Sequence, residues 1–141
     1  MSVQVRRRGG AVLATLGVAA WLLPAMGAMA QPAIPRLLVM DLPYARVWEG
    51  AVRALGEYTL ARASGGIIET ARVERAPLPD EAGVERVAER VTVRVEAVAD
   101  SITRVTVTVE AEGLSGGRWR AVDASPTTVR RILDRIRASI G

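Results

Sequence analysis

Residues 91–112 read VTVRVEAVADSITRVTVTVEAE, and this stretch predicts the fold of the chain more clearly than any other. Valine or alanine fills every odd position from 91 to 97 and from 105 to 111, whereas the even positions carry threonine, arginine or glutamate. Side chains alternate between the two faces of a strand, so the pattern predicts two strands, each apolar on one face. The polar face is expected to be exposed to solvent, which is typical of an antiparallel sheet covered on one side only.

The charges within this stretch predict how the two strands pair. A loop over residues 99–101 places Glu96 opposite Arg104 and Val98 opposite Ile102. Opposite charges that face each other across strands contribute roughly 0.2–1 kcal/mol. The next possible register loses this charge pair, so we prefer the first.

The N-terminal segment has the pattern of a secretory signal peptide. Three arginines at 6–8 precede an uncharged apolar run over 11–23, which is shorter than the roughly 20 residues that cross a bilayer. Pro24 ends the run, and small residues at Ala28 and Ala30 form a cleavage site. We therefore expect residues 1–30 to be removed, with a mature start at Gln31 in the periplasm or outside the cell, and no transmembrane segment afterwards. A buried N-terminal helix is the alternative interpretation.

Composition excludes several function classes. Removing the arginines at 6–8 lowers the formal net charge from +4 to +1, which does not favour nucleic-acid binding. The chain has no His, no Cys and no Lys, so the usual nucleophile–base pairs and nitrogen or sulfur metal sites are absent. The carboxylate pairs Glu110/Glu112 and Asp80/Glu81 are read as solvated charges. We expect a non-catalytic protein with no cofactor and no metal.

The other elements follow in order from periodicity and turn signals. An extended lead-in over 31–40 ends in apolar residues that either form a short strand or pack on the core. Helices are expected to begin at Asp41-Leu42-Pro43 and at Ser125-Pro126, and strands are expected over 58–63, 67–75 and 118–122, in addition to the pair over 91–112. Residues 41–141 are therefore predicted to form one two-layer α+β domain, an antiparallel sheet of four or five strands with both helices on one face.

Details of these elements can be tested against a structure. Asp41 is the expected N-cap of the first helix, and Gly56 its C-cap. Trp48 lies in the apolar stripe of that helix, and we place it in the core rather than on a ligand platform. In the strand over 67–75, odd positions such as Ile67 are assigned to one face and Thr70 to the other. Glu89, on the apolar parity, indicates that the core ends by residue 91.

Part of the sequence resembles small bacterial envelope domains of the BamC type. The resemblance rests on Y-x-x-V-W-x-x-A-x-x-A-L over 44–55, on Y-x-L over 58–60 and on G-I-I-x-T over 66–70. It implies a helix-grip-like fold, in which a curved sheet holds a C-terminal helix. It also implies an accessory role beside the machinery that assembles outer-membrane β-barrels.

Two groups of residues are candidates for partner binding. Arg118, Trp119 and Arg120 could hold an anionic ligand between guanidinium groups, unless Trp119 packs inward as strand alternation allows. The polar arc of the last helix carries Arg130, Arg131, Arg135 and Arg137 around Asp134, and it either is a solvated face or docks an envelope protein or anionic envelope surface. The favoured function is that of an envelope accessory protein. A small-ligand carrier with a cavity between sheet and helices is the alternative, and its sign would be a cavity above roughly 300 Å³.

Overall fold

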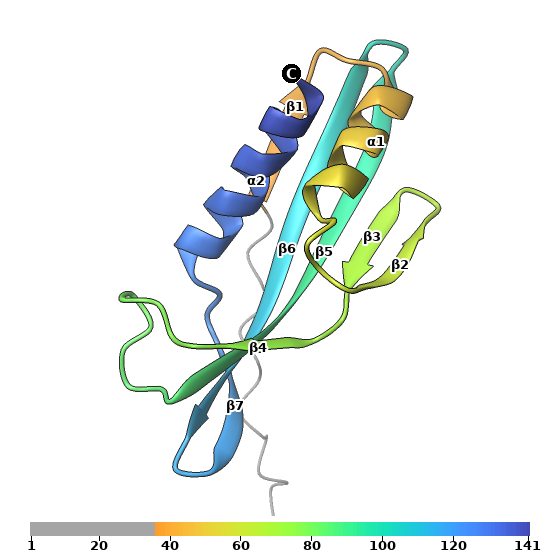
Figure 1. Cartoon of the computed structure of the whole chain (residues 1–141). Coiled ribbons are helices and arrows are strands. Elements are labelled where there is room, and N and C mark those ends of the chain that lie inside the picture. The colour runs from red at the N-terminus through yellow and green to blue at the C-terminus, as the bar shows by residue number, and fades with distance from the viewer. Residues whose placement is uncertain (1–35) are drawn as a thin grey trace, which may run out of the picture.

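The computed structural model describes residues 36–141, which form one antiparallel sheet and two helices (Figure 1). The elements are β1 (Arg36–Met40), α1 (Tyr44–Ala54), β2 (Leu60–Ser64), β3 (Ile67–Thr70), β4 (Val73–Arg75), β5 (Arg86–Ala99), β6 (Ile102–Ser115), β7 (Arg118–Val122) and α2 (Pro126–Ile140). The expected signal peptide and the start of the lead-in lie outside the described residues. Among those described, neither helix is long and apolar enough to cross a membrane.

The predicted strand pair is the axis of the fold. β5 and β6 are 14 residues each, and they pair antiparallel along their whole length. Glu96 faces Arg104 as predicted, and an ion pair of 3.1 Å joins them. The end of the hairpin differs, because Ile102 faces Ala99 rather than Val98. Val98 is the extra residue of a bulge, which leaves a tighter turn than the three-residue loop that we expected.

Within residues 36–141 the sheet has seven strands, more than the four or five predicted, because each long strand is flanked by two short ones and β2 adds to β3. The free edge of β6 pairs with β1 at one end and with β7 at the other. The free edge of β5 pairs with β3 and β4 in the same way. The lead-in therefore ends in a true strand, β1, and two of its side chains, Leu38 and Met40, also pack against the core.

The predicted strand over 67–75 is divided into β3 and β4. The division changes which of its residues face the helices and which face solvent. Ile67 pairs with Arg94, whereas Val73 pairs with Glu89, so the ladder slips by one residue between the two segments. A slip of one residue exchanges the two faces of a strand. Consequently Ile68 and Thr70 are buried in β3, and the expectation that all odd positions of 67–75 share one face was wrong.

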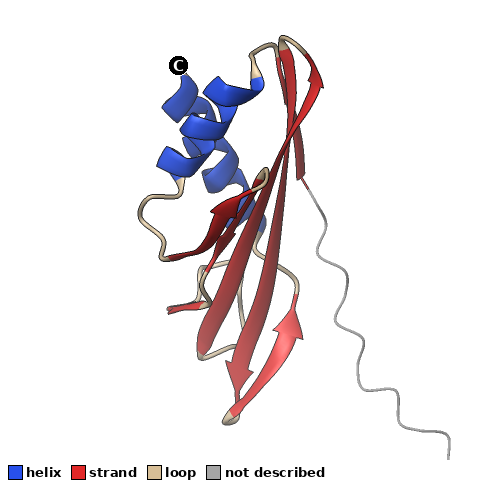
Figure 2. Cartoon of the chain, turned by 90° about the vertical axis from the view of Figure 1, so that its right-hand side faces the viewer, coloured by secondary structure: helices blue, strands red, loops and turns tan. Residues whose placement is uncertain are grey.

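Both helices cover the same face of the sheet, as Figure 2 shows from the side. Fully buried side chains of the helices (Val47, Leu55, Ile132, Ile136) meet fully buried valines of β5 and β6 (Val91, Val93, Val105, Val107). The helices also touch each other, because a Cβ on Gly50 of α1 would collide with Ile140 of α2. The predicted fold class, a helix-grip-like α+β domain with helices on one face, is confirmed.

Four sequence predictions about these elements need correction. The N-cap of α1 is Pro43 with no side-chain cap, not Asp41, and its C-cap is Leu55 rather than Gly56. Trp48 is only partly buried, since it flanks the buried stripe instead of occupying its centre. The core does not end by residue 91, because Val87 is fully buried and Glu89 is buried beside it.

Candidate functional site

The outward face of α2 holds most of the predicted site. The N-cap of α2 is Ser125, whose hydroxyl accepts a hydrogen bond from Thr127 N at 3.2 Å, and Pro126 occupies the first turn. The inner arc of the helix is buried against the sheet and α1. Its charged side chains are therefore held on the solvent side, which is where the sequence placed them.

The arginines on this face differ in their partners. Arg135 Nη1 lies 2.8 Å from Glu57 Oε2, beyond the end of α1, and Arg137 Nη1 lies 3.5 Å from Asp134 Oδ1. Arg130 and Arg131 are exposed, and neither makes an ion pair within the described part of the chain. The face thus offers two uncompensated guanidinium groups.

A shallow, open depression lies on the same face of α2. Its lining consists of Thr127, Arg130, Arg131, Asp134, Arg135 and Ala138. These positions are spaced by three or four residues, so they form one stripe of the helix. Much of an arginine side chain is an aliphatic stem, and such stems can cover a partner's apolar surface while the charged ends bind its carboxylates.

The second predicted group, on β7, is not assembled as expected. Trp119 pairs with Leu114 on the face of the sheet away from the helices, so the expectation that it packs inward was wrong. The guanidinium of Arg72 lies 4.5 Å from the centre of its ring, and Glu112 and Glu74 hold that guanidinium at 2.9 and 3.0 Å.

Arg118 and Arg120 are exposed and, by strand alternation, point to the opposite face from Trp119. β7 also lies at the end of the sheet away from the helix pair (Figures 1 and 2). The structure therefore does not bring the β7 residues together with the arginines of α2, and the two groups are separate surfaces.

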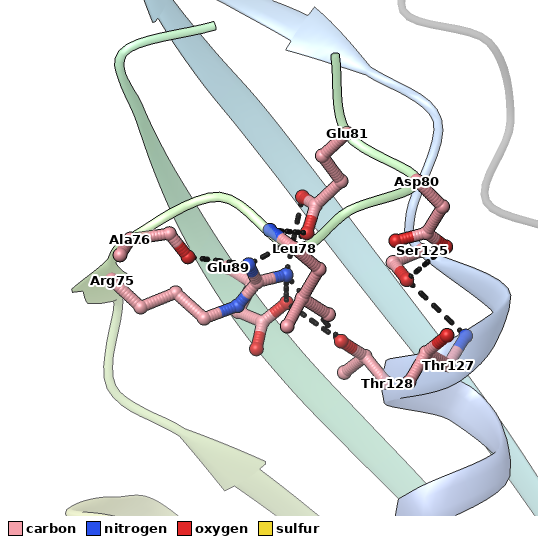
Figure 3. Close-up of polar contacts among 9 residues, drawn as sticks. All are labelled: Arg75, Ala76, Leu78, Asp80, Glu81, Glu89, Ser125, Thr127 and Thr128. Atoms are coloured by element: carbon pink, nitrogen blue, oxygen red, sulfur yellow. Dashed lines mark hydrogen bonds and ion pairs between the residues drawn. The ribbon is translucent and has the colours of Figure 1, made fainter.

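A buried polar cluster that the sequence reasoning missed joins β4, β5, the loop over 76–85 and α2 (Figure 3). Arg75 donates from Nη1 to Glu81 Oε1 at 2.7 Å and from Nη2 to Glu89 Oε2 at 2.9 Å. The side chains of Glu81 and Glu89 are only 7% and 6% exposed. Thr128 Oγ1, in the first turn of α2, lies 3.4 Å from both Arg75 Nη2 and Glu89 Oε2.

The contacts of the cluster tie the loop over 76–85 to the sheet and to the start of α2. Burial by itself lowers the pKa of Arg75, but the hydrogen bonds and charges of Glu89 and Glu81 outweigh it, so that pKa lies above its ordinary value. Glu81 Oε1 also accepts from Leu78 N at 3.1 Å, and Ser125 Oγ donates to Asp80 Oδ2 at 2.7 Å. These contacts fasten the 76–85 loop to the start of α2.

One signal for this cluster was present in the sequence. Glu89 is a charged residue at an apolar position of a strand, and a buried carboxylate requires a partner. The sequence could not identify Arg75 as that partner, because the slip between β3 and β4 decides which face Arg75 occupies. Within residues 36–141, no group of three or more acidic side chains is close enough to share a metal ion.

The large side chains at the centre of the interface between the sheet and the helices are fully buried. Eight of them, the four of the helices and the four valines named above, have no accessible surface at all.

Comparisons with known proteins support the fold but identify no family. No family model matches the chain, and no curated protein matches it. A TBP-like protein from Parabacteroides distasonis aligns with 77% of this chain and 92% of its own at 7% identity, with a TM-score of 0.51. A protein from Nitrosospira multiformis covers 78% of this chain and 97% of its own at 17% identity, with a TM-score of 0.41.

The solved structure of Ara h 8.0201 covers 77% of this chain and 93% of its own at 14% identity, with a TM-score of 0.37. This likeness and that to the Nitrosospira protein are too distant to support an argument. The likeness to the TBP-like protein and the structure itself show the architecture: an antiparallel sheet whose N- and C-terminal helices pack together on one face, in a helix-grip-like α+β fold.

Proposed function

We propose that this protein is an exported, non-catalytic accessory protein of the bacterial envelope that acts by binding an acidic protein partner through α2. The observation that carries the proposal is the pair Arg130 and Arg131, two exposed arginines without an ion-pair partner among the described residues, beside an open depression. Arginine is the residue best suited to bidentate binding of carboxylates. The resemblance to BamC-type domains supports an accessory role in the envelope.

Two features favour a protein partner over a lipid surface. Asp134 lies among the arginines of the depression and would repel anionic head groups. The face also lacks the large apolar side chains with which interfacial helices enter a membrane, since Ala138 is its main apolar member. An acidic protein segment can pair with the arginines and avoid Asp134, which a uniform layer of head groups cannot.

A carrier function receives less support. A ligand between the sheet and the helices would have to displace large side chains that are fully buried there, such as Leu55, Ile132 and Ile136. Catalysis is not part of the proposal either, because the buried carboxylates Glu81 and Glu89 are both engaged by Arg75.

The test replaces Arg130, Arg131 and Arg137 with Gln and measures binding to a Glu-rich helical peptide by fluorescence anisotropy. We expect the wild type to bind more weakly as salt rises, and the variant to lose about tenfold in affinity, as truncated charge pairs at interfaces do. The control replaces Arg46, Arg62 and Arg90 with Gln, which are exposed arginines elsewhere and change the net charge equally.

Two results would count against the proposal. Equal losses in the variant and the control would mean that only net charge matters. Binding to phosphatidylglycerol vesicles that depends on Arg130 and Arg131, with no peptide binding, would assign the face to lipid. Export is tested separately by the intact mass of the exported chain, which should begin at Gln31.

A further inference from the structure

β1 forms one edge of the sheet. It pairs with β6 on one side only, in a regular register over all five residues, and the sheet ends there. Every second residue of β1 therefore directs its N–H and C=O groups away from the sheet, with no strand in the described part of the chain to receive them. Such an edge is a template for another strand.

The other edges of the sheet carry protection that β1 lacks. β2, at the opposite end, has an irregularity between Leu60 and Arg62, and a charged side chain in its centre. β7 carries Arg118 and Arg120, and β4 is only three residues long with two charges. Bulges, charges and short length are the usual devices that prevent edge pairing. β1 has one charge, at its first residue, and neither a bulge nor a proline within it.

The side chains of β1 are divided between two faces. Leu38 and Met40 pack against the core, which fixes the strand in place. Leu37 and Val39 lie on the solvent face of the sheet and are 60% and 55% exposed. They are the two most exposed large apolar side chains of the described chain besides Val98, and they stand side by side at the open edge.

The sequence of this edge is complementary to itself. Residues that oppose each other across an antiparallel pair share a face. If two copies pair about a two-fold axis perpendicular to the sheet and centred on Leu38, then Leu37 of each copy faces Val39 of the other on the solvent face. Arg36 of each copy then faces Met40 of the other, so no like charges meet.

We propose that β1 is a self-association site, at which two copies of this chain join their sheets edge to edge in an isologous antiparallel dimer. The pairing closes the open edge in both copies and sets the four exposed apolar side chains, Leu37 and Val39 of each copy, against one another on the solvent face. A five-residue strand pair is much smaller than a standard interface, so the dimer is weak and forms reversibly as concentration rises.

The experiment is sedimentation velocity of the purified protein over a wide concentration range. The wild type should shift from monomer toward dimer as concentration rises. Val39→Lys places two like charges against the partner's β1 and should keep the protein monomeric at all concentrations. Val98→Lys changes an equally exposed apolar side chain, 58% exposed at the β5–β6 turn, and should dimerise as the wild type does. Ala61→Lys, on the opposite edge strand β2, is the matched edge control.

Because Leu37 and Val39 are exposed in the monomer, urea melts of these variants should be unchanged, which separates loss of association from loss of fold.

Several results would overturn the proposal. A monomer at the highest concentration reached means that no second copy binds at β1. A dimer that survives Val39→Lys, or that Ala61→Lys destroys, lies at another surface. The triple Gln variant of α2 should dimerise normally, so the outcome is independent of the proposed partner site.

Discussion

Arg75 and Glu89 form a diagonal ion pair between β4 and β5. In the ladder Arg75 faces Val87 and Glu89 faces Val73, yet Arg75 Nη2 reaches Glu89 Oε2 at 2.9 Å. The guanidinium also holds Glu81 of the following loop at 2.7 Å, so one cation neutralises charge from two carboxylates beneath α2. A charge inside a sheet of valines is tolerated because its partner approaches from the neighbouring strand and the loop closes over both.

Removal of Arg75 should be one of the most damaging single changes in the chain. Arg75→Met leaves Glu81 and Glu89 buried without a cation, and breaking a buried ion pair in this way typically costs about 3–5 kcal/mol. Urea unfolding followed by circular dichroism measures the loss. Arg72→Met removes an arginine that also contacts two glutamates but at an exposed site, and it should cost clearly less. Equal losses would show that the buried position of Arg75 contributes nothing special.

Ser125 should contribute to stability twice, through the helix cap and through the loop. Its hydroxyl accepts from Thr127 N and donates to Asp80 Oδ2. Ser125→Ala is expected to lower the free energy of unfolding by about 1–2 kcal/mol, the usual cost of a lost N-cap. Asp80→Ala removes the loop contact and spares the cap, so it should cost less. If the two variants lose the same amount, the cap bond is not the main contribution.

The close approach of the helices at Gly50 predicts an unusual double-variant result. A Cβ at this position collides with Ile140, so Gly50→Ala should destabilise by about 1 kcal/mol even though alanine favours the helix by about as much. In an Ile140→Ala background the space is open, and the same change should stabilise the protein. Thermal melts of the four variants give the coupling between the two sites. Additive effects would mean that the helices can separate without cost.

Trp48 should matter less than its size indicates. Its ring is stacked on Tyr44 with centroids 6.2 Å apart and planes 9° apart, at the edge of the core. Trp48→Ala should cost about 2 kcal/mol, below the 3–5 kcal/mol of a fully buried aromatic, which the sequence alone indicated. Leu55→Ala, at a fully buried position of the same stripe, should cost more. The reverse order in urea melts would show that Trp48 is a true core residue.

Local patterns predicted the parts of the fold that depend on local rules. The β5–β6 register followed from alternation and from the Glu96–Arg104 pair, since a shift by one residue would have turned valines to water. The start of α2 followed from Ser125-Pro126, because capping depends on residues next to each other in the chain. The exposed arginines of α2 followed from helical periodicity in the same way.

The sequence by itself determined the fold class, the central hairpin and the polar face of α2, because each is encoded within a few consecutive residues. Only the tertiary structure decided the inner face of β3, the partner of Glu89 and the side of the sheet on which Trp119 lies. The one-residue slip between β3 and β4 sets the first two, and the pairing of β7 with the far end of β6 sets the third. These features depend on contacts between segments distant in the chain, and the free energies that select among such pairings belong to the assembled sheet rather than to any one strand.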